Sequence, residues 1–404
     1  MKLPISVTVL TGFLGSGKTT LLKALLQHKD MAKTAVIVNE FGDVGIDDAL
    51  IAEADDDVVL LPSGCVCCEV RGDLVVALNK LCERMTKGEM EPVERVVIET
   101  TGLADPAPIA HTLITEEDLF RVFQLDAIVT TVDGELGLAQ IEEQYEPAKQ
   151  IAVADRIVIT KGDRTDGPSL ARLESRIRAL NPAAEILRVV SGAVEPKAII
   201  GLGAFEPIAA KAHAEGWLAA ERYQHDPHCH DPHCHHPGHD HGHDHTHDHG
   251  HDHGHGHDCG PDCGHDHHHD NAHAHGHQEA HHTAEAPRHL HGVRSFALAY
   301  DTPLDGKKLS LALELIRSAH GEKLLRIKGI VHIQGQPVPF VIHGVQHVFY
   351  PPAPMEKPAT GGATRSRLVF ITKDLDEATI SATLDPLLTG DGPADLSTWR
   401  AMGA

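Results

Sequence analysis

Basic residues and long apolar runs are scarce in this sequence of 404 residues. Lysine and arginine number 35 against 58 aspartates and glutamates, which gives a formal net charge of -23. Because nucleic acids and anionic membranes repel such a chain, we expect neither as a partner. No apolar stretch is long enough to cross a bilayer, and the first residues do not resemble a signal peptide. We therefore expect a cytoplasmic protein.

A disulfide framework is not expected either, although the sequence contains eight cysteines. The cytosol keeps thiols reduced, so cysteines there serve as metal ligands, catalytic thiols or small core residues. Cys82 lies on the apolar side of a predicted helix and fits the core. Cys65, Cys67 and Cys68 stand together in one loop and need another explanation.

The chain divides by composition into zones. Residues 225–291 hold most of the 34 histidines, interspersed with aspartate and glycine and almost without apolar side chains. Such a segment cannot bury enough surface to offset the entropy of ordering, so we expect a tether that is disordered without metal. The predicted boundaries are 1–195 for the first domain, 196–224 for a connecting segment, 225–291 for the tract, 292–390 for the C-terminal domain and 391–404 for a tail.

The fold class expected for the first domain is α/β. Continuous valine and isoleucine runs alternate with amphipathic helical stretches, a pattern that indicates a mostly parallel sheet covered on both faces, as in P-loop nucleotide-binding domains. After the tract, the pattern predicts a strand, a helix, three strands and a helix, with one of the strands over residues 337–350. This is a smaller α+β domain, and we find no catalytic constellation in it.

A phosphate-binding loop is predicted where a strand over residues 6–10 meets a helix. The stretch "GFLGSGKT" fits G-x-x-x-x-G-K-[ST], in which backbone N–H groups cradle phosphate oxygens at a helix N-terminus. The lysine reaches the β- and γ-phosphates, and the following hydroxyl binds Mg²⁺. The nucleotide-binding residues expected here are Gly12, Gly15, Ser16, Gly17, Lys18, Thr19 and Thr20.

Two later strand ends complete the predicted nucleotide site. Glu99 ends the strand "RVVIE" and is expected beside Mg²⁺, although a solvated strand-end carboxylate is the alternative. Thr160, Lys161 and Asp163 fit the guanine motif [NT]-K-x-D, in which the aspartate accepts the two N–H groups of the guanine edge. This favours GTP, while an ATP-using P-loop enzyme remains the rival.

The three clustered thiols are interpreted first as a metal site. Cys65, Cys67 and Cys68 offer soft donors that suit Zn²⁺, Cu⁺ or Co²⁺, and one loop supplies too few ligands for a closed structural site. A redox thiol pair and a trio of small core residues are the alternatives. Glu40 is a candidate fourth ligand, or else a solvated loop carboxylate.

The histidine tract has two possible roles. Its imidazoles and its cysteines Cys229, Cys234, Cys259 and Cys263 can bind Zn, Ni, Cu or Co in many arrangements, which would raise the metal concentration near the thiol loop. The alternative is a solubilising spacer. Composition does not select the metal.

Five stretches in order carry a family resemblance: "TGFLGSGKTTLL", "VNEFGDVGID", "GCVCC", "VIETTGLADP" and "TKGD". Together they resemble the CobW-like metallochaperone GTPases of the SIMIBI class, over about Pro4 to Val194, and the segment from about Gly292 to Leu388 resembles that family's C-terminal domain. The resemblance implies that the C-x-C-C motif binds Zn²⁺, or Co²⁺ in some branches. It also implies that GTP hydrolysis accompanies delivery of the metal to a client apo-metalloprotein.

The function expected from residues and resemblance together is that of a GTP-hydrolysing zinc chaperone. Lys18 and Glu99 are the expected catalytic residues, GTP/GDP and Mg²⁺ the cofactors, and Zn²⁺ the metal that is transferred. One alternative is a chaperone that delivers Co²⁺, either for cobalamin synthesis or to a cobalt enzyme. The other is a metal buffer or sensor with a regulatory GTPase. We expect a monomer or a dimer that forms with nucleotide or metal.

Overall fold

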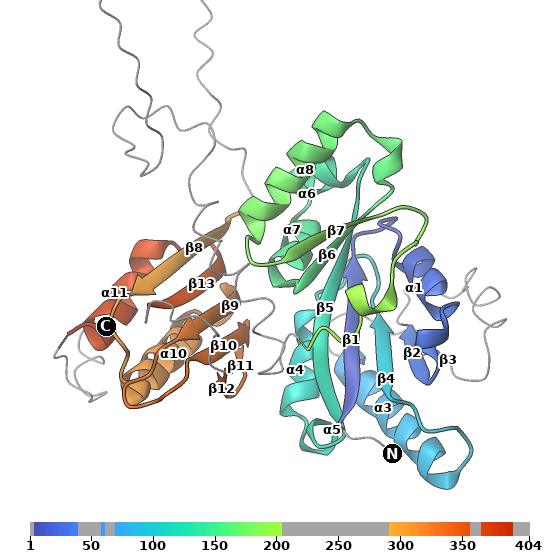
Figure 1. Cartoon of the computed structure of the whole chain (residues 1–404), viewed down its shortest axis with the longest axis horizontal. Coiled ribbons are helices and arrows are strands. Elements are labelled where there is room, and N and C mark those ends of the chain that lie inside the picture. The colour runs from blue at the N-terminus through green and yellow to red at the C-terminus, as the bar shows by residue number, and fades with distance from the viewer. Residues whose placement is uncertain (1–3, 39–57, 61–68, 204–290, 356–364, 391–404) are drawn as a thin grey trace, which may run out of the picture. The chain divides into compact units, whose positions relative to one another are not determined.

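The computed structural model describes residues 4–38, 58–60, 69–203, 291–355 and 365–390. A seven-stranded parallel sheet forms the first domain, with β1 at its centre between β4 and β5 (Figure 1). The strand order is β3 (Val58–Leu60), β2 (Thr34–Val38), β4 (Arg95–Glu99), β1 (Ile5–Gly12), β5 (Phe123–Asp133), β6 (Arg156–Thr160) and β7 (Glu185–Val189). The predicted parallel sheet is confirmed.

Alternate residues of β1, β2, β4, β5 and β6 face two different hydrophobic cores, so both faces of this part of the sheet are covered. Val7 and Val9 of β1 lie in one core, whereas Leu10 lies in the other. The helix α1 (Lys18–Leu26) packs into the core of Leu10. The opposite core takes residues from α3 (Glu69–Lys87), α4 (Ala107–Thr115), α5 (Glu117–Phe120), α6 (Gly137–Glu143), α7 (Tyr145–Val153) and α8 (Gly167–Leu180).

The sequence predicts helices over residues 18–28, 74–85 and 168–180, which correspond to α1, α3 and α8, but it predicts none at α4 to α7. The four missed helices have at most nine residues, and α7 is buried on most sides, including its polar Gln150. A short helix that is buried nearly all round shows no contrast between an apolar and a polar face, so its period is not visible in the sequence. Short 3₁₀ segments are η1 (Lys29–Met31), η2 (Gly162–Arg164) and η3 (Pro196–Ala198).

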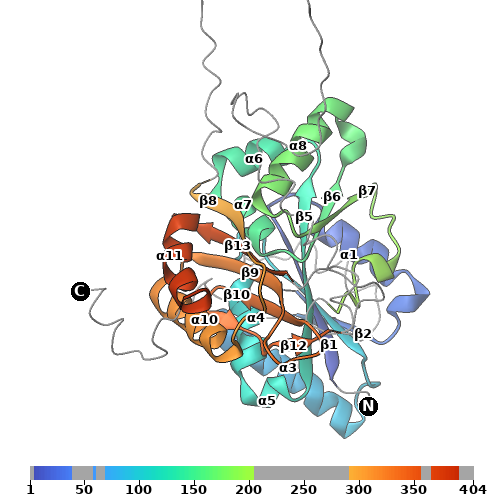
Figure 2. The ribbon, with the colours of Figure 1, turned by 60° about the vertical axis from the view of Figure 1, so that its left-hand side comes forward.

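The C-terminal domain is a six-stranded antiparallel sheet with two helices. The strands lie in the order β11 (Val348–Phe349), β10 (Phe340–Val345), β9 (Leu324–Val331), β13 (Ser366–Lys373) and β8 (Val293–Tyr300), while β12 (Ala353–Pro354) also pairs with β10. Helices α10 (Gly306–His320) and α11 (Glu377–Leu388) share one core with this sheet and lie together on one face of it (Figure 2). The predicted α+β domain is confirmed.

One predicted element of this domain is wrong. The single strand predicted over residues 337–350 is instead the hairpin β10–β11, whose tight turn places Val345 opposite Val348. Gln346 adopts a left-handed conformation with φ 51°, which an extended strand does not allow. His347 therefore lies in the turn, where its ring centroid is 4.9 Å from that of His111 on α4.

Both sheets belong to one compact unit of the chain, and their cores join. Apolar side chains of the second sheet pack into the larger core of the first domain, on the face away from α10 and α11. These residues are Val293, Leu325, Val345 and Ile371. Among the described residues, no helix is both long and apolar enough to cross a membrane.

A buried carboxylate links the two sheets. Asp155, between α7 and β6, accepts a hydrogen bond from Ile128 N at 2.9 Å and is paired with Arg326 and with Lys328, whose Nζ lies 2.7 Å away. Burial alone would raise the pKa of Asp155, but the two cations on β9 outweigh it and lower this pKa to about 2. Burial lowers the pKa of Lys328 to about 8, and Asp155 opposes that effect.

Candidate nucleotide-binding site

The phosphate-binding loop lies where the sequence predicts it, between β1 and α1. Three glycines of the loop have positive φ angles that residues with a Cβ atom rarely adopt. These angles are 144° for Gly12, 72° for Gly15 and 89° for Gly17. A Cβ on Gly12 would lie 2.2 Å from Thr131 Oγ1, so the loop sits directly against β5. Lys18 Nζ donates to Gly12 O at 2.9 Å and to Phe13 O at 3.1 Å, which holds the ammonium over the loop.

The two predicted magnesium ligands lie together. Thr19 Oγ1 at the start of α1 donates to Glu99 Oε1 at the end of β4, at 2.6 Å. Glu99 is 4% exposed although its side chain is ionisable. Hydroxyl and carboxylate oxygens are hard donors of the kind that Mg²⁺ prefers. Beside a triphosphate, which supplies oxygens of its own, the protein has to provide only some of the ligands of the ion. These two residues therefore fit Mg²⁺.

The guanine motif is joined to the phosphate-binding loop by two side chains. Thr160 Oγ1 donates to Ser16 O at 2.7 Å, and Lys161 Nζ donates to Gly15 O at 2.7 Å. Lys161 takes the left-handed conformation, φ 53°, just before the 3₁₀ segment η2 that carries the exposed Asp163. The structure thus brings the phosphate and base motifs into one site, with Thr20 exposed next to it.

Asp133 at the end of β5 is a site residue that the sequence did not reveal. Its Oδ2 accepts from Lys161 Nζ at 2.7 Å, and its Oδ1 accepts from the backbone N–H groups of Glu135 and Leu136. Burial acts to raise the pKa of Asp133, but the hydrogen bonds from Lys161, Leu136 and Glu135 lower it below its ordinary value. The carboxylate is therefore ionised at neutral pH and fixes Lys161 beside the loop.

The segment after β4 closes the other side of the site. Thr100 Oγ1 donates to Thr11 Oγ1 at 2.8 Å, and Gly102 packs so tightly that a Cβ there would lie 2.6 Å from Leu14 N. Leu14 and Leu103 are about half exposed on this side, at 54% and 51%. A displacement of this segment would therefore reach the phosphate-binding loop directly.

Two family descriptions match the chain. Residues 6–188 match the CobW/HypB/UreG nucleotide-binding domain, and residues 293–388 match the C-terminal domain of the cobalamin synthesis protein cobW. The chain belongs to the CobW family. The matched ranges coincide with the two sheets described above, so each has its counterpart in this family.

Relatives of this CobW-family chain carry names that concern zinc. It is 29% identical over 382 residues to the zinc chaperone YjiA of Escherichia coli, and this match covers 94% of this chain and 97% of that protein. It is 33% identical to the zinc-regulated GTPase metalloprotein activator 1 of Dictyostelium discoideum, over 56% of this chain and 54% of that protein. The Zn(II)-bound crystal structure of the E. coli YjiA GTPase matches with a TM-score of 0.61 and 25% identity, over 96% of this chain and 99% of that one.

The predicted metal ligands of the CobW-family chain, Cys65, Cys67, Cys68 and Glu40, lie outside the described residues, so their arrangement stays a prediction. Within the described parts of the chain, no group of three or more His, Cys, Asp or Glu side chains is arranged to hold a metal ion. Cys82 is half-buried against the core of the first domain, as predicted, and burial raises the pKa of its thiol.

Proposed function

We propose that this protein hydrolyses GTP and couples the hydrolysis to the delivery of zinc. Cys65, Cys67 and Cys68 bind Zn²⁺ as cargo, and a client apo-metalloprotein receives it. The observation that most directly supports the nucleotide part is the 2.6 Å contact between Thr19 and Glu99 beside the phosphate-binding loop. The zinc part rests on the family and on the names of the relatives, which include zinc chaperones.

Each residue has a distinct role in this proposal. Lys18 stabilises charge on the β- and γ-phosphates, and Thr19 and Glu99 would hold Mg²⁺. Asp163 accepts the N–H groups of guanine, while Lys161 packs along the base. When bound, Mg²⁺ supplies electrostatic stabilisation of the phosphates, and the protein holds the ion in place.

Base selection is tested with Asp163→Ala, measured by competition of GTP and ATP for the site. Loss of hydrogen bonds to a charged acceptor should weaken GTP binding about 10- to 100-fold and leave weak ATP binding unchanged. Asp118→Ala on the exposed side of α5 is the matched control. Equal affinities for GTP and ATP in the wild type would support an ATP-using enzyme instead.

Cargo is tested by titrating Zn²⁺ and Co²⁺ into the protein with Mg²⁺ and either GTP or GDP. The proposal expects tighter zinc binding with GTP, lost in Cys65→Ser, and the same behaviour in a variant that lacks residues 225–291. Tighter binding of Co²⁺ would support the cobalt alternative. If high-affinity binding disappears with residues 225–291 and does not depend on nucleotide, the protein is a metal buffer.

A further inference from the structure

Helix α7 carries a buried polar side chain that the proposed reaction does not yet use. Gln150 is 1% exposed, and its Nε2 donates to Gly102 O at 3.2 Å and to Ala104 O at 3.0 Å. Burying an amide is costly unless its donors are satisfied, and here both bonds go to the segment after β4. Gln150 therefore fixes the backbone that packs against the phosphate-binding loop at Leu14.

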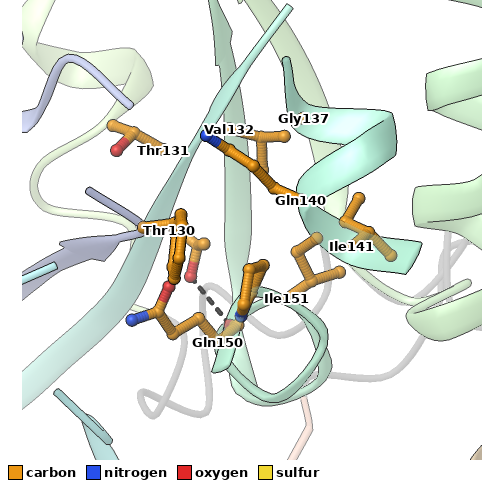
Figure 3. A pocket seen from close by; sticks show the side chains of 10 residues that line it. Thr130, Thr131, Val132, Gly137, Gln140, Ile141, Gln150 and Ile151 are labelled. Carbon is orange, nitrogen blue, oxygen red and sulfur yellow. Dashed lines mark hydrogen bonds between the residues drawn. The ribbon is translucent and has the colours of Figure 1, made fainter. Parts of the chain in front are cut away.

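The backbone of Gln150 is fixed as well. Thr130 Oγ1 on β5 donates to Gln150 O at 2.9 Å, as the dashed line in Figure 3 shows. Gln150 also lines a small cavity of about 10 Å³ with Phe13 and Thr131, next to the phosphate-binding loop. Its Oε1 has no hydrogen-bond partner among the described residues. The orientation of the amide is therefore set by its two bonds to Gly102 and Ala104.

The preceding residue of α7 makes a second link to the same segment. Lys149 Nζ lies 2.6 Å from Asp105 Oδ2, and Asp105 Oδ1 accepts from Ala107 N at 3.0 Å at the start of α4. Gln346, in the β10–β11 turn of the C-terminal domain, also donates to Asp105 Oδ2, at 3.3 Å. Asp105 thus receives one contact from α7 and one from the C-terminal sheet.

Both ends of α7 contact the C-terminal domain. At its start, Lys373 Nζ of β13 lies 4.0 Å from the centre of the Tyr145 ring, within the range of a cation–π interaction. At its end, Val153 O accepts from Arg326 at 3.1 Å, and Asp155 pairs with Arg326 and Lys328. One short helix therefore contacts the C-terminal sheet at both ends and the segment after β4 in its middle.

We propose that α7 transmits the position of the C-terminal sheet to residues 101–105, with Gln150 and Lys149 as positioning residues, and that the C-terminal domain thereby sets the rate of GTP hydrolysis. The rate statement rests on the function proposed above. A helix of nine residues moves as a rigid rod about 13 Å long, so a shift at Tyr145 or Val153 displaces Gln150 as well. Contact of a client protein with the C-terminal sheet would act on the nucleotide by the same route.

The first test is hydrogen exchange at residues 101–105 in the full chain. Gln150→Leu removes both donors while keeping the size of the side chain, and Lys149→Met removes the ion pair at a more exposed position. Both should speed exchange of these amides. Lys373→Met removes the distant contact at Tyr145 and should speed the same amides, whereas Lys87→Met on the exposed face of α3 should leave them unchanged.

The second test is steady-state GTP hydrolysis by the same proteins. Couplings through packed elements correspond to rate changes between about 2- and 30-fold, so we expect kcat to change by that factor in Gln150→Leu and Lys373→Met. KM for GTP should change less than about twofold. In a background that carries both Gln150→Leu and Lys149→Met, Lys373→Met should have no further effect, because both links of α7 to residues 101–105 are then removed.

The outcomes separate the two proposals. Unchanged exchange at residues 101–105 in Lys373→Met would overturn the role of α7, whatever the hydrolysis rates are. Faster exchange in Lys373→Met, together with a wild type that does not hydrolyse GTP, would support the role of α7 and remove only the proposed GTPase. A further effect of Lys373→Met on kcat in the background that lacks both Gln150 and Lys149 would also overturn the proposal, because it would show a route that does not pass through these links.

Discussion

Single glycines of the phosphate-binding loop differ in what surrounds them. A Cβ on Gly12 would meet Thr131 Oγ1 at 2.2 Å and Thr131 O at 2.4 Å, whereas a Cβ on Gly15 would meet nothing within 4 Å. Both have positive φ, so both resist substitution on conformational grounds. Of these two glycines, only Gly12 also has a backbone atom, Thr131 O, that an added Cβ would clash with.

Gly12→Ala should therefore destabilise the protein more than Gly15→Ala does. We expect a loss of about 3 kcal/mol or more in the free energy of unfolding for Gly12→Ala, and about 1 kcal/mol for Gly15→Ala, in which only backbone strain acts. Urea unfolding without nucleotide measures both changes. Equal losses would show that Thr131 yields to the added methyl group.

The nucleotide-site residues divide into those that the sequence reveals and those that it does not. Lys18, Thr19 and Thr160 stand in motifs whose spacing is local, so the sequence alone is enough to assign them. Asp133 and Gln150 have no such signal, because their partners stand 28 and 48 positions away. A lone aspartate at a strand end and a lone glutamine in a helix acquire a role only when the fold brings these partners together.

At the scale of elements, the strands were the most predictable part. Continuous valine and isoleucine runs mark β1, β2, β4, β5 and β6, because both faces of a parallel sheet are buried. The hairpin β10–β11 was missed, since a glutamine with positive φ is not a turn signal in sequence. The predicted domain boundaries and the thiol site stay predictions.

The junction between α7, β6 and β9 depends on the charge of Asp155. Asp155→Asn leaves Arg326 and Lys328 buried with their shared anion gone, and removal of one partner from a buried ion pair costs about 3–5 kcal/mol. We expect a loss of that size by urea unfolding at pH 7. Asp301→Asn, which removes an exposed pair with Arg365, should cost at most about 1 kcal/mol.

Acid should act on the same junction. The fold lowers the pKa of Asp155 from its ordinary value to about 2. The stability that its charge contributes is therefore fully present at any pH above the ordinary pKa of an aspartate. This contribution is lost as the pH falls from about 4 toward 2. The difference in free energy of unfolding between the wild type and Asp155→Asn should therefore shrink over this range. A constant difference would show that another group carries the pH dependence.

At the scale of the whole molecule, nucleotide and zinc should affect each other equally. If GTP with Mg²⁺ tightens zinc binding by some factor, zinc must tighten GTP binding by the same factor, because coupling free energies are reciprocal. Calorimetric titrations of each ligand, with and without the other, measure both factors. Zinc affinities that are equal with GTP and with GDP would contradict a nucleotide-driven delivery cycle.

The pair between Asp155 and Arg326 joins residues that are 171 positions apart in the chain. At translation rates of about 5–20 residues per second, the ribosome needs roughly 10 to 35 s to add that much chain. All seven strands of the first sheet are synthesised within that interval or before it, and so is the histidine tract. The nascent first domain therefore presents Asp155 and α7 without their partners on β9 while the histidine tract is being synthesised.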